Sequence, residues 1–158
     1  MYTYETLRVG DAFSASRAIT AEDAQTFARV IGLAPSVGED PTRRSRCGRP
    51  AAHGLLLLGL VSKVLGRDFP GHGSVAVDLS CRFLRPVPVG SEVTVEVQIT
   101  EKIEKRKYVR AHVYVRLDGR AVLDGEGTVL PPSEEKGSDA LIPAGRPRRR
   151  ARSARDSR

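Results

Sequence analysis

The sequence predicts an α+β fold in which an antiparallel sheet wraps around a buried central helix. Residues 50–65 are apolar on nearly every side of a helix, so other elements must enclose this segment. Between residues 75 and 130, apolar and polar residues alternate along several segments, which is typical of strands with one face toward solvent. Because one wrapped sheet leaves an edge strand unpaired, the sequence also predicts a dimer.

A helix is predicted to follow an extended lead-in over residues 1–19. Thr20 is suited to cap the free amides, and Glu22 and Asp23 place negative charge at the positive end of the helix dipole. Gly32 is a natural stop. The residues expected to form its buried stripe recur at helical spacing and are Ala24, Phe27, Ala28 and Ile31.

Residues 33–49 lack periodicity and are expected to form a loop, and loops of this length inside a compact domain are often functional. Pro50 is predicted to begin the central helix, because the missing proline N–H would be unpaired in the first turn anyway. Gly66 is predicted to end this helix. The leucines at 55–58 are expected mainly to pack in the core and secondarily to line any ligand tunnel.

At least four antiparallel strands are predicted after the helix. Asp118–Gly119 is a hairpin signal between the last two of them. His112 shares a strand face with Tyr114 and Arg116, and this face is expected to be solvated. The residues predicted to face the core are Val75, Val77, Leu79, Cys81 and Phe83, then Val93, Val95, Val97 and Ile99, then Ala111, Val113, Val115 and Leu117.

Residues 1–132 are predicted to form one domain, and residues 133–158 an Arg-rich tail without ordered structure. The formal net charge is +7, but seven Arg and one Asp give residues 146–158 a net charge of +6. The folded part is therefore nearly neutral, which argues against a nucleic-acid partner.

Neither a membrane segment nor a metal site is expected. The longest apolar-rich run, residues 51–65, is too short and too polar to span a bilayer, and residues 1–5 contain no apolar signal stretch. Cys47 and Cys81 form no metal-binding motif, although a disulfide between them is left open. These features predict a cytoplasmic protein without metal or cofactor.

Several motifs, found together, are specific to one family. Gly48-Arg49-Pro50 followed by His53-Gly54 resembles the start of the central helix in the MaoC-like family of (R)-specific enoyl-CoA hydratases and 3-hydroxyacyl dehydratases, which have the hotdog fold. The resemblance covers residues 5–130 and implies an acyl-CoA or acyl carrier protein thioester as ligand. Further matching segments are Ile19-Thr20-Ala21-Glu22-Asp23, Phe27-Ala28, Leu60-Val61-Ser62, Leu65-Gly66, Pro70-Gly71-His72-Gly73, Phe83, Pro86-Val87 and Val89-Gly90-Ser91-Glu92-Val93.

The sequence departs from this family at its catalytic signature, Gly-Asp-x-Asn-Pro-x-His, in which the Asp and the His act on one water. The corresponding segment here reads Gly32-Leu33-Ala34-Pro35-Ser36-Val37-Gly38. Without gaps, Leu33 stands at the Asp position and Gly38 at the His position; alignment on the proline instead puts Val37 at the His position. None of these side chains transfers protons, so no catalytic residue is expected in this chain.

The sequence retains the residues that bind the substrate in this family, and the resemblance implies substrate contacts by His53, Gly54 and Ser62. In the family, the glycine N–H after the helix-opening His holds the thioester carbonyl, as expected for free amides at a helix N-terminus. Structural alternatives stay open: His53 caps the helix, Gly54 allows close packing, and the Ser62 hydroxyl bonds to a carbonyl one turn back.

Three functions are therefore weighed. The first is a catalytically silent hydratase/dehydratase subunit in a heterodimer with a related subunit that retains the Asp and His, although a homodimer is also considered. The second is a hotdog thioesterase that uses Glu39 or Asp40 with the Gly54 amide. The third is an acyl-thioester binding protein without enzymatic activity. The sequence does not specify the acyl chain, the pathway, the choice between CoA and carrier protein, or the role of the tail.

Overall fold

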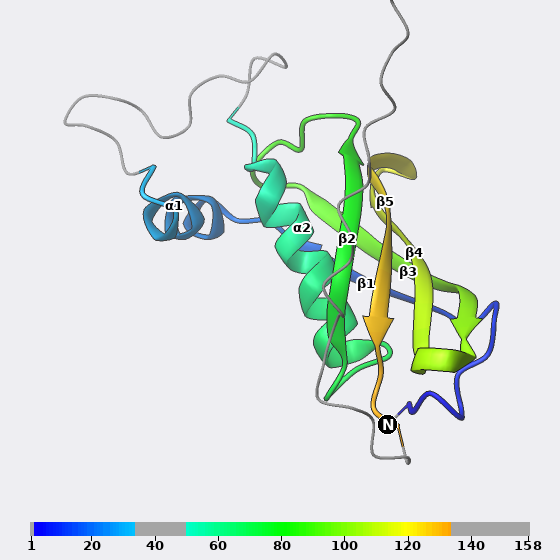
Figure 1. The fold of residues 1–158 in the computed structure, drawn as a ribbon. Helices are drawn as coiled ribbons and strands as arrows, with labels where there is room; N and C mark the ends of the chain where they lie inside the picture. Colours follow the sequence, from blue (N-terminus) through cyan, green and yellow to red (C-terminus); the bar gives the residue numbers. More distant parts are fainter. Residues whose placement is uncertain (1, 34–49, 134–158) are drawn as a thin grey trace, which may run out of the picture.

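The fold is built on a five-stranded antiparallel sheet, seen in a computed structural model that describes residues 2–33 and 50–133 (Figure 1). In space the strand order is β1-β3-β4-β5-β2, so β1 and β2 form the two edges of the described sheet. The strands are β1 (Ala12–Ala18), β2 (Val75–Phe83), β3 (Glu92–Ile103), β4 (Tyr108–Leu117) and β5 (Arg120–Leu130).

The N-terminal segment is more ordered than a simple extended lead-in. Its residues 12–18 form β1, which pairs along its whole length with the first half of β3, from Ala12 opposite Gln98 to Ala18 opposite Glu92. The prediction missed this strand because its sequence alternates weakly, with Ala and Ser where a more typical strand has branched apolar residues.

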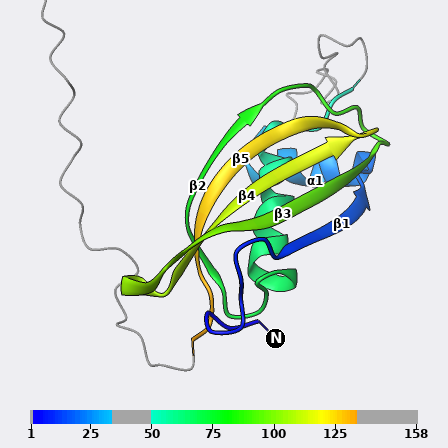
Figure 2. The same cartoon turned by 90° about the vertical axis from the view of Figure 1, so that its right-hand side faces the viewer.

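The sheet curls around α2 (Gly54–Lys63), as predicted, and the core lies between them (Figure 2). Each β3 and β4 residue predicted to face inward is buried except Leu117, which packs partly buried against the same core. From the helix, the core receives Leu57, Leu60 and Val61. Period-two alternation therefore identified the inner face of the central strands.

The edge strand β2 differs from that prediction. Val75 and Phe83 keep 41% and 49% of their surface exposed, although the alternation predicts both as core residues. Between them, Leu79 and Cys81 pack only partly buried against the core. A β-bulge between Ala76 and Asp78 shifts the alternation, so that Ala76 rather than Val75 packs against the core. Phe83 is the last residue of β2, which is an edge strand of the described sheet.

The central helix begins four residues later than predicted, at Gly54 rather than Pro50. Residues 50–52 are instead paired with the segment after β2: Pro50 O accepts from the Val89 N–H at 2.9 Å, and the Ala52 N–H donates to Val87 O at 2.8 Å. Gly66 does not end the helical segment either, because a π-helical turn, η1 (Val64–Asp68), continues directly from α2.

The first helix, α1 (Ala21–Val30), starts as predicted but packs less than predicted. Thr20 and Asp23 cap it reciprocally, each side chain accepting the other residue's backbone N–H, at 3.1 Å and 3.0 Å. However, no α1 residue is buried, and the helix stands beside the sheet rather than on it (Figure 1). The predicted stripe is half-buried at Ala24, Phe27 and Ala28, and Ile31 is exposed.

The other end of the fold is closed by the chain's two terminal segments. The Lys102 ammonium on β3 donates to the carbonyl oxygens of Tyr4 and Leu7, at 2.6 and 2.8 Å, and the Tyr4 N–H donates to Pro132 O at 2.8 Å. The β4–β5 hairpin turns at Asp118 and Gly119 with positive φ at both, as the sequence predicts. A 3-10 turn, η2 (Glu104–Arg106), joins β3 to β4.

Candidate functional site

The N-terminus of α2 is the element that carries the predicted binding residues. His53 is its cap: the ring Nδ1 accepts the Leu55 N–H at 3.2 Å. The ring lies against Phe27 of α1, with centroids 5.4 Å apart. The structure thus shows His53 as a helix cap, and its contact with a substrate stays a prediction.

Gly54 is the first residue of α2, so its N–H is one of the amides without an acceptor inside the helix. Its Cα faces the Phe83 ring, and a Cβ built at this position would lie 3.0 Å from two ring carbons. An alanine here would require the half-exposed Phe83 ring to shift by a few tenths of an ångström. The same packing leaves the amide at the helix end, where a carbonyl oxygen could accept it, so both interpretations of Gly54 fit the geometry.

A pocket of about 260 Å³ lies beside this helix end. Its walls come from the approach to α2, from α2 itself and from the segment that follows β2. The lining residues are Ala52, Gly54, Leu57, Phe83, Leu84, Arg85, Pro86 and Val87. Of the leucines predicted for a tunnel, Leu57 lines this pocket, whereas Leu55 points out and is largely exposed.

The structure does not bring Ser62 to this pocket. Ser62 is exposed and lies eight residues beyond Gly54 on the same helix, roughly 12 Å along its axis. Sequence reasoning, in turn, did not assign a binding role to the segment 83–87. The signal that could have found it is the Phe83, Leu84 and Pro86 sequence, an apolar run with a proline directly after a predicted strand.

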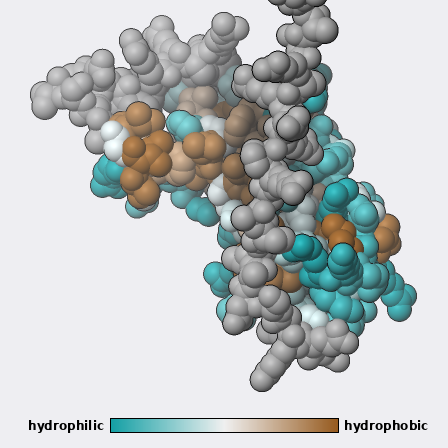
Figure 3. Space-filling view, viewed as in Figure 1, coloured by the Kyte–Doolittle hydropathy of each residue, from teal (hydrophilic) through white to brown (hydrophobic). Residues whose placement is uncertain are grey.

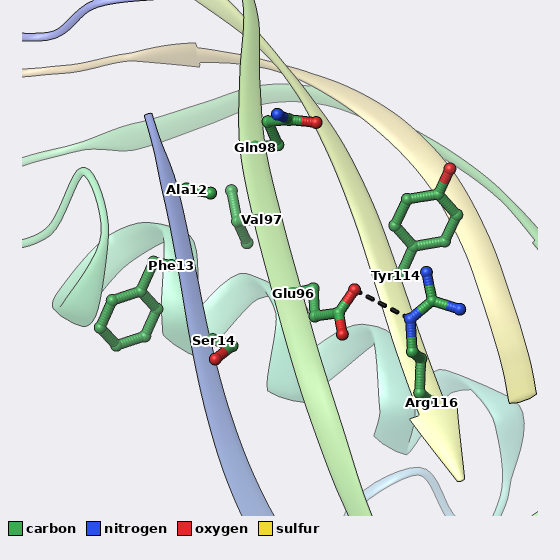
Figure 4. Close-up of a pocket in the computed structure, with 8 residues that line it drawn as sticks. All are labelled: Ala12, Phe13, Ser14, Glu96, Val97, Gln98, Tyr114 and Arg116. Atoms are coloured by element: carbon green, nitrogen blue, oxygen red, sulfur yellow. Dashed lines mark hydrogen bonds and ion pairs between the residues drawn. The ribbon is translucent and has the colours of Figure 1, made fainter. Parts of the chain in front are cut away.

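A larger hollow, about 460 Å³, lies elsewhere, on the outer face of the sheet across β1, β3 and β4 (Figure 4). Glu96 accepts from the Arg116 Nε at 2.9 Å, and this bond is the main reason why the pKa of Arg116 is raised. The guanidinium also lies 4.7 Å from the centre of the Tyr114 ring. The two charged side chains of this hollow, Glu96 and Arg116, are thus already paired with each other.

His112 continues the same polar face, as predicted. Its ring stacks on Tyr114 at 4.4 Å, and its Nε2 lies 2.6 Å from Asp124 Oδ1. This hydrogen bond across β4 and β5 was not predicted, because strand register is needed to show that Asp124 lies opposite Tyr114 and so diagonally across from His112. This face stabilises the sheet's outer surface and holds no group aimed at the α2 pocket.

Other features of the predicted site can be placed only in part. Within the described ranges, no three His, Cys, Asp or Glu side chains are grouped to hold a metal ion. Cys81 is a free thiol, and burial raises its pKa. No helix in the same ranges is long and apolar enough to cross a membrane.

The loop predicted to carry the altered signature begins at Leu33, which is exposed at the end of α1. The remaining signature positions 34–38, the alternative carboxylates Glu39 and Asp40, and Cys47 lie outside the described residues, as does the Arg-rich tail beyond Ser133. Their predicted roles stay predictions.

Comparisons with known proteins support the predicted family. The MaoC like domain family matches residues 8–120. The chain is 31% identical over 135 residues to an (R)-specific enoyl-CoA hydratase of Rhodospirillum rubrum, covering 84% of this chain and 94% of that one. It is 33% identical over 135 residues to a 3-hydroxybutyryl-CoA dehydratase of Methylorubrum extorquens, covering 84% and 86%.

The fold leads to the same conclusion. An (R)-hydratase of A. caviae involved in PHA biosynthesis superposes with a TM-score of 0.74 at 31% identity, covering 81% of this chain and 99% of that one. The ChsH1–ChsH2 complex of Mycobacterium tuberculosis shares the fold, with a TM-score of 0.66 at 14% identity and coverage of 78% and 98%. The sheet wrapped around α2 is therefore the hotdog fold, and the chain belongs to the MaoC-like family of (R)-specific hydratases and dehydratases.

Proposed function

We propose that this chain is the catalytically silent subunit of a heterodimeric (R)-specific hydratase/dehydratase that acts on acyl thioesters. One observation carries the proposal: after α1 the sequence has Leu33, and neither alignment of the following residues provides the Asp and His of the family signature. Addition or removal of water needs one group to take a proton and another to supply one. A second subunit that bears both residues would provide them.

The exposed apolar surface supports a partner subunit. The apolar side chains that remain exposed around the N-terminal end of α2 are Val30, Ile31, Leu33, Leu55, Phe83 and Leu84. Figure 3 shows apolar side chains gathered over α1 and the adjoining part of α2. A contiguous apolar surface of this kind is typical of protein interfaces. The open edge of β2 offers backbone groups for pairing as well.

A related hotdog pair provides precedent for the proposed assembly. The ChsH1–ChsH2 structure is named as a complex of two chains. In the proposed heterodimer, this chain contributes the interface, the pocket beside α2 and the Gly54 N–H as a donor to the thioester carbonyl. The ligand class proposed is the acyl thioester of CoA or of an acyl carrier protein, as the names of the relatives suggest.

The test compares the purified chain with the chain co-expressed beside a MaoC-like subunit that retains the Asp and His. Hydration of crotonyl-CoA and of a longer enoyl-CoA is measured for each, together with the mass of the assembly. We expect no hydration by the chain alone, a stable pair of unlike subunits, and activity in the pair above that of the partner subunit alone.

Each other outcome contradicts the proposal. Hydration by the chain alone would show that it has its own proton-transfer groups. Hydrolysis of the thioester, lost in Glu39→Ala or Asp40→Ala, would favour the thioesterase function instead. Thioester binding without turnover in any pairing would leave a non-enzymatic binding protein, and a chain that forms only a homodimer would remove the proposed partner.

A further inference from the structure

The pocket beside α2 has one ionisable side chain in its wall, Arg85. The other lining residues are apolar or glycine, so no carboxylate in the wall neutralises the guanidinium. Arg85 lies two residues after the end of β2 at Phe83, and it lines the same pocket as Gly54. A cation at the rim of an otherwise apolar pocket favours a ligand that has both an apolar part and an anionic part.

The guanidinium is held in place but not saturated. Its Nη1 donates to Ala121 O, at the start of β5, at 2.7 Å. An arginine has five N–H donors, and among the described residues no further hydrogen bond or ion pair uses the others of Arg85. The residue is exposed, so these donors are accessible. A tethered arginine loses less side-chain freedom when it binds an anion than an untethered one.

We infer that Arg85 is a specificity-determining residue that binds the phosphate at the end of the pantetheine arm of the thioester. This inference rests on the proposed function, because it concerns the ligand of the same pocket. Acyl-CoA and acyl carrier protein thioesters share this phosphate, whereas simple thioesters have none. Planar, paired N–H donors match phosphate oxygens well, and hydrogen bonds to a charged acceptor are stronger than neutral ones. Arg85 would therefore select phosphorylated thioesters.

The experiment measures dissociation constants of three ligands that carry the same acyl group: crotonyl-pantetheine without phosphate, crotonyl-phosphopantetheine with one, and crotonyl-CoA. The full chain is used, in its assembly with the partner subunit where one forms. We expect the wild-type protein to bind both phosphorylated ligands about tenfold or more tightly than crotonyl-pantetheine. Similar binding of the two phosphorylated ligands would indicate that the shared phosphate suffices. Tighter binding of crotonyl-CoA would add a contact with its nucleotide.

Arg85→Gln should remove the preference for phosphate and leave crotonyl-pantetheine binding unchanged, while Arg85→Lys should retain part of it. Arg82→Gln is the matched control, since Arg82 lies on β2 three residues away and lines a different hollow on the outer face. The control should bind all three ligands as the wild type does. Unfolding midpoints of the variants report on the lost bond to Ala121.

The outcomes distinguish failure of the proposed function from failure of the role assigned to Arg85. If the wild-type protein binds no thioester, the proposed function fails and this inference fails with it. If the wild-type protein binds all three thioesters equally, the inference about Arg85 alone is overturned, whether or not any variant folds. It is also overturned if Arg85→Gln weakens all three ligands equally, or if Arg82→Gln loses the phosphate preference to the same extent.

Discussion

The centre of the sheet buries its apolar side chains, whereas the end of the molecule around the start of α2 leaves several of them exposed. On β3 and β4 the inward side chains are buried against α2, and the outward ones pair across strands, as Glu96 does with Arg116. Around the start of α2, Val30 keeps 78% of its surface exposed and Leu33 keeps 56%, although both are apolar. One region buries its apolar side chains within the chain, and the other leaves them exposed.

The difference indicates where stability and function reside. A closed core fixes the fold within the chain, because large buried side chains contribute most of the stabilising free energy. The open end carries Gly54, Phe83 and Arg85, which are the residues assigned to the ligand or next to it. Substitutions at the centre should therefore change folding, whereas substitutions at the open end should change binding and assembly.

The largest expected effect is at the centre of the core. Leu123 on β5 is fully buried, so Leu123→Ala should lower the free energy of unfolding by about 2–5 kcal/mol, through lost burial and the cavity left behind. Leu84→Ala is the matched change at the open end, where the side chain is half-exposed. It should change the stability of the isolated chain by only about 0.5 kcal/mol.

Urea denaturation of the isolated chain measures both variants. For Leu84→Ala, we also expect weaker association with the partner subunit, measured by titration of one purified subunit into the other. Equal losses of stability for the two leucines would contradict the contrast between a closed centre and an open end.

Two glycines give a smaller effect with the same chemical change. A Cβ at Gly125 on β5 would lie 2.5 Å from the backbone oxygen of Ser80 and 2.9 Å from Cys81 Cβ, so Gly125→Ala must push β2 away from β5. A Cβ at Gly54 would meet only the Phe83 ring, at 3.0 Å, and this half-exposed ring is free to turn aside.

We expect Gly125→Ala to destabilise the chain by about 1–3 kcal/mol. Gly54→Ala should stay within about 1 kcal/mol of wild type, since alanine also favours the helix. Thermal and urea unfolding measure both. A larger loss for Gly54→Ala would mean that the start of α2 is packed as rigidly as the sheet.

The sequence predicts the centre of the sheet better than the open end, for a physical reason. Alternation along β3 and β4 records which face is buried, because successive side chains of a strand point to opposite faces of the sheet. The N-cap at Thr20 is also local, and it was predicted correctly, whereas Asp23 was predicted only to place charge at the helix start and not to accept the Thr20 N–H. Properties that depend on residues close together in the chain can therefore be predicted from the sequence.

Properties that depend on a residue's position in the assembled fold cannot be predicted in this way. Pro50 suits a helix start, yet its carbonyl is used by Val89, so the helix begins only at Gly54. The stripe of α1 has helical spacing, but nothing in the pattern shows whether a surface lies against it. The sequence did not predict that Arg85 lines the pocket, because its neighbours in space come from α2 and from the segment that precedes α2.

The smallest expected effect concerns α1 itself and tests how loosely this helix is attached. The Thr20 N–H, at 3.0 Å, is the main cause that lowers the pKa of the Asp23 carboxyl, assisted by the Thr20 hydroxyl and by Arg17. A carboxyl whose pKa is lowered by folding stabilises the folded form above its unfolded pKa of about 3.9 and loses this contribution as the pH falls through the lower folded value. At pH 7 the cap should therefore contribute fully, about 1 kcal/mol.

Asp23→Ala should thus increase local opening of α1, seen as faster amide hydrogen exchange in residues 24–28, and lower the free energy of global unfolding by no more than about 1 kcal/mol. Glu22→Ala is the control, because Glu22 lies in the same first turn but takes no part in the capping pair. The excess opening of Asp23→Ala over wild type should shrink as the pH falls below about 3.9. If the amides of residues 24–28 exchanged only through global unfolding, as slowly as those of β3 and β4, α1 would unfold together with the sheet. The exposed end would then belong to the cooperative core, and its apolar residues would no longer point to a missing partner.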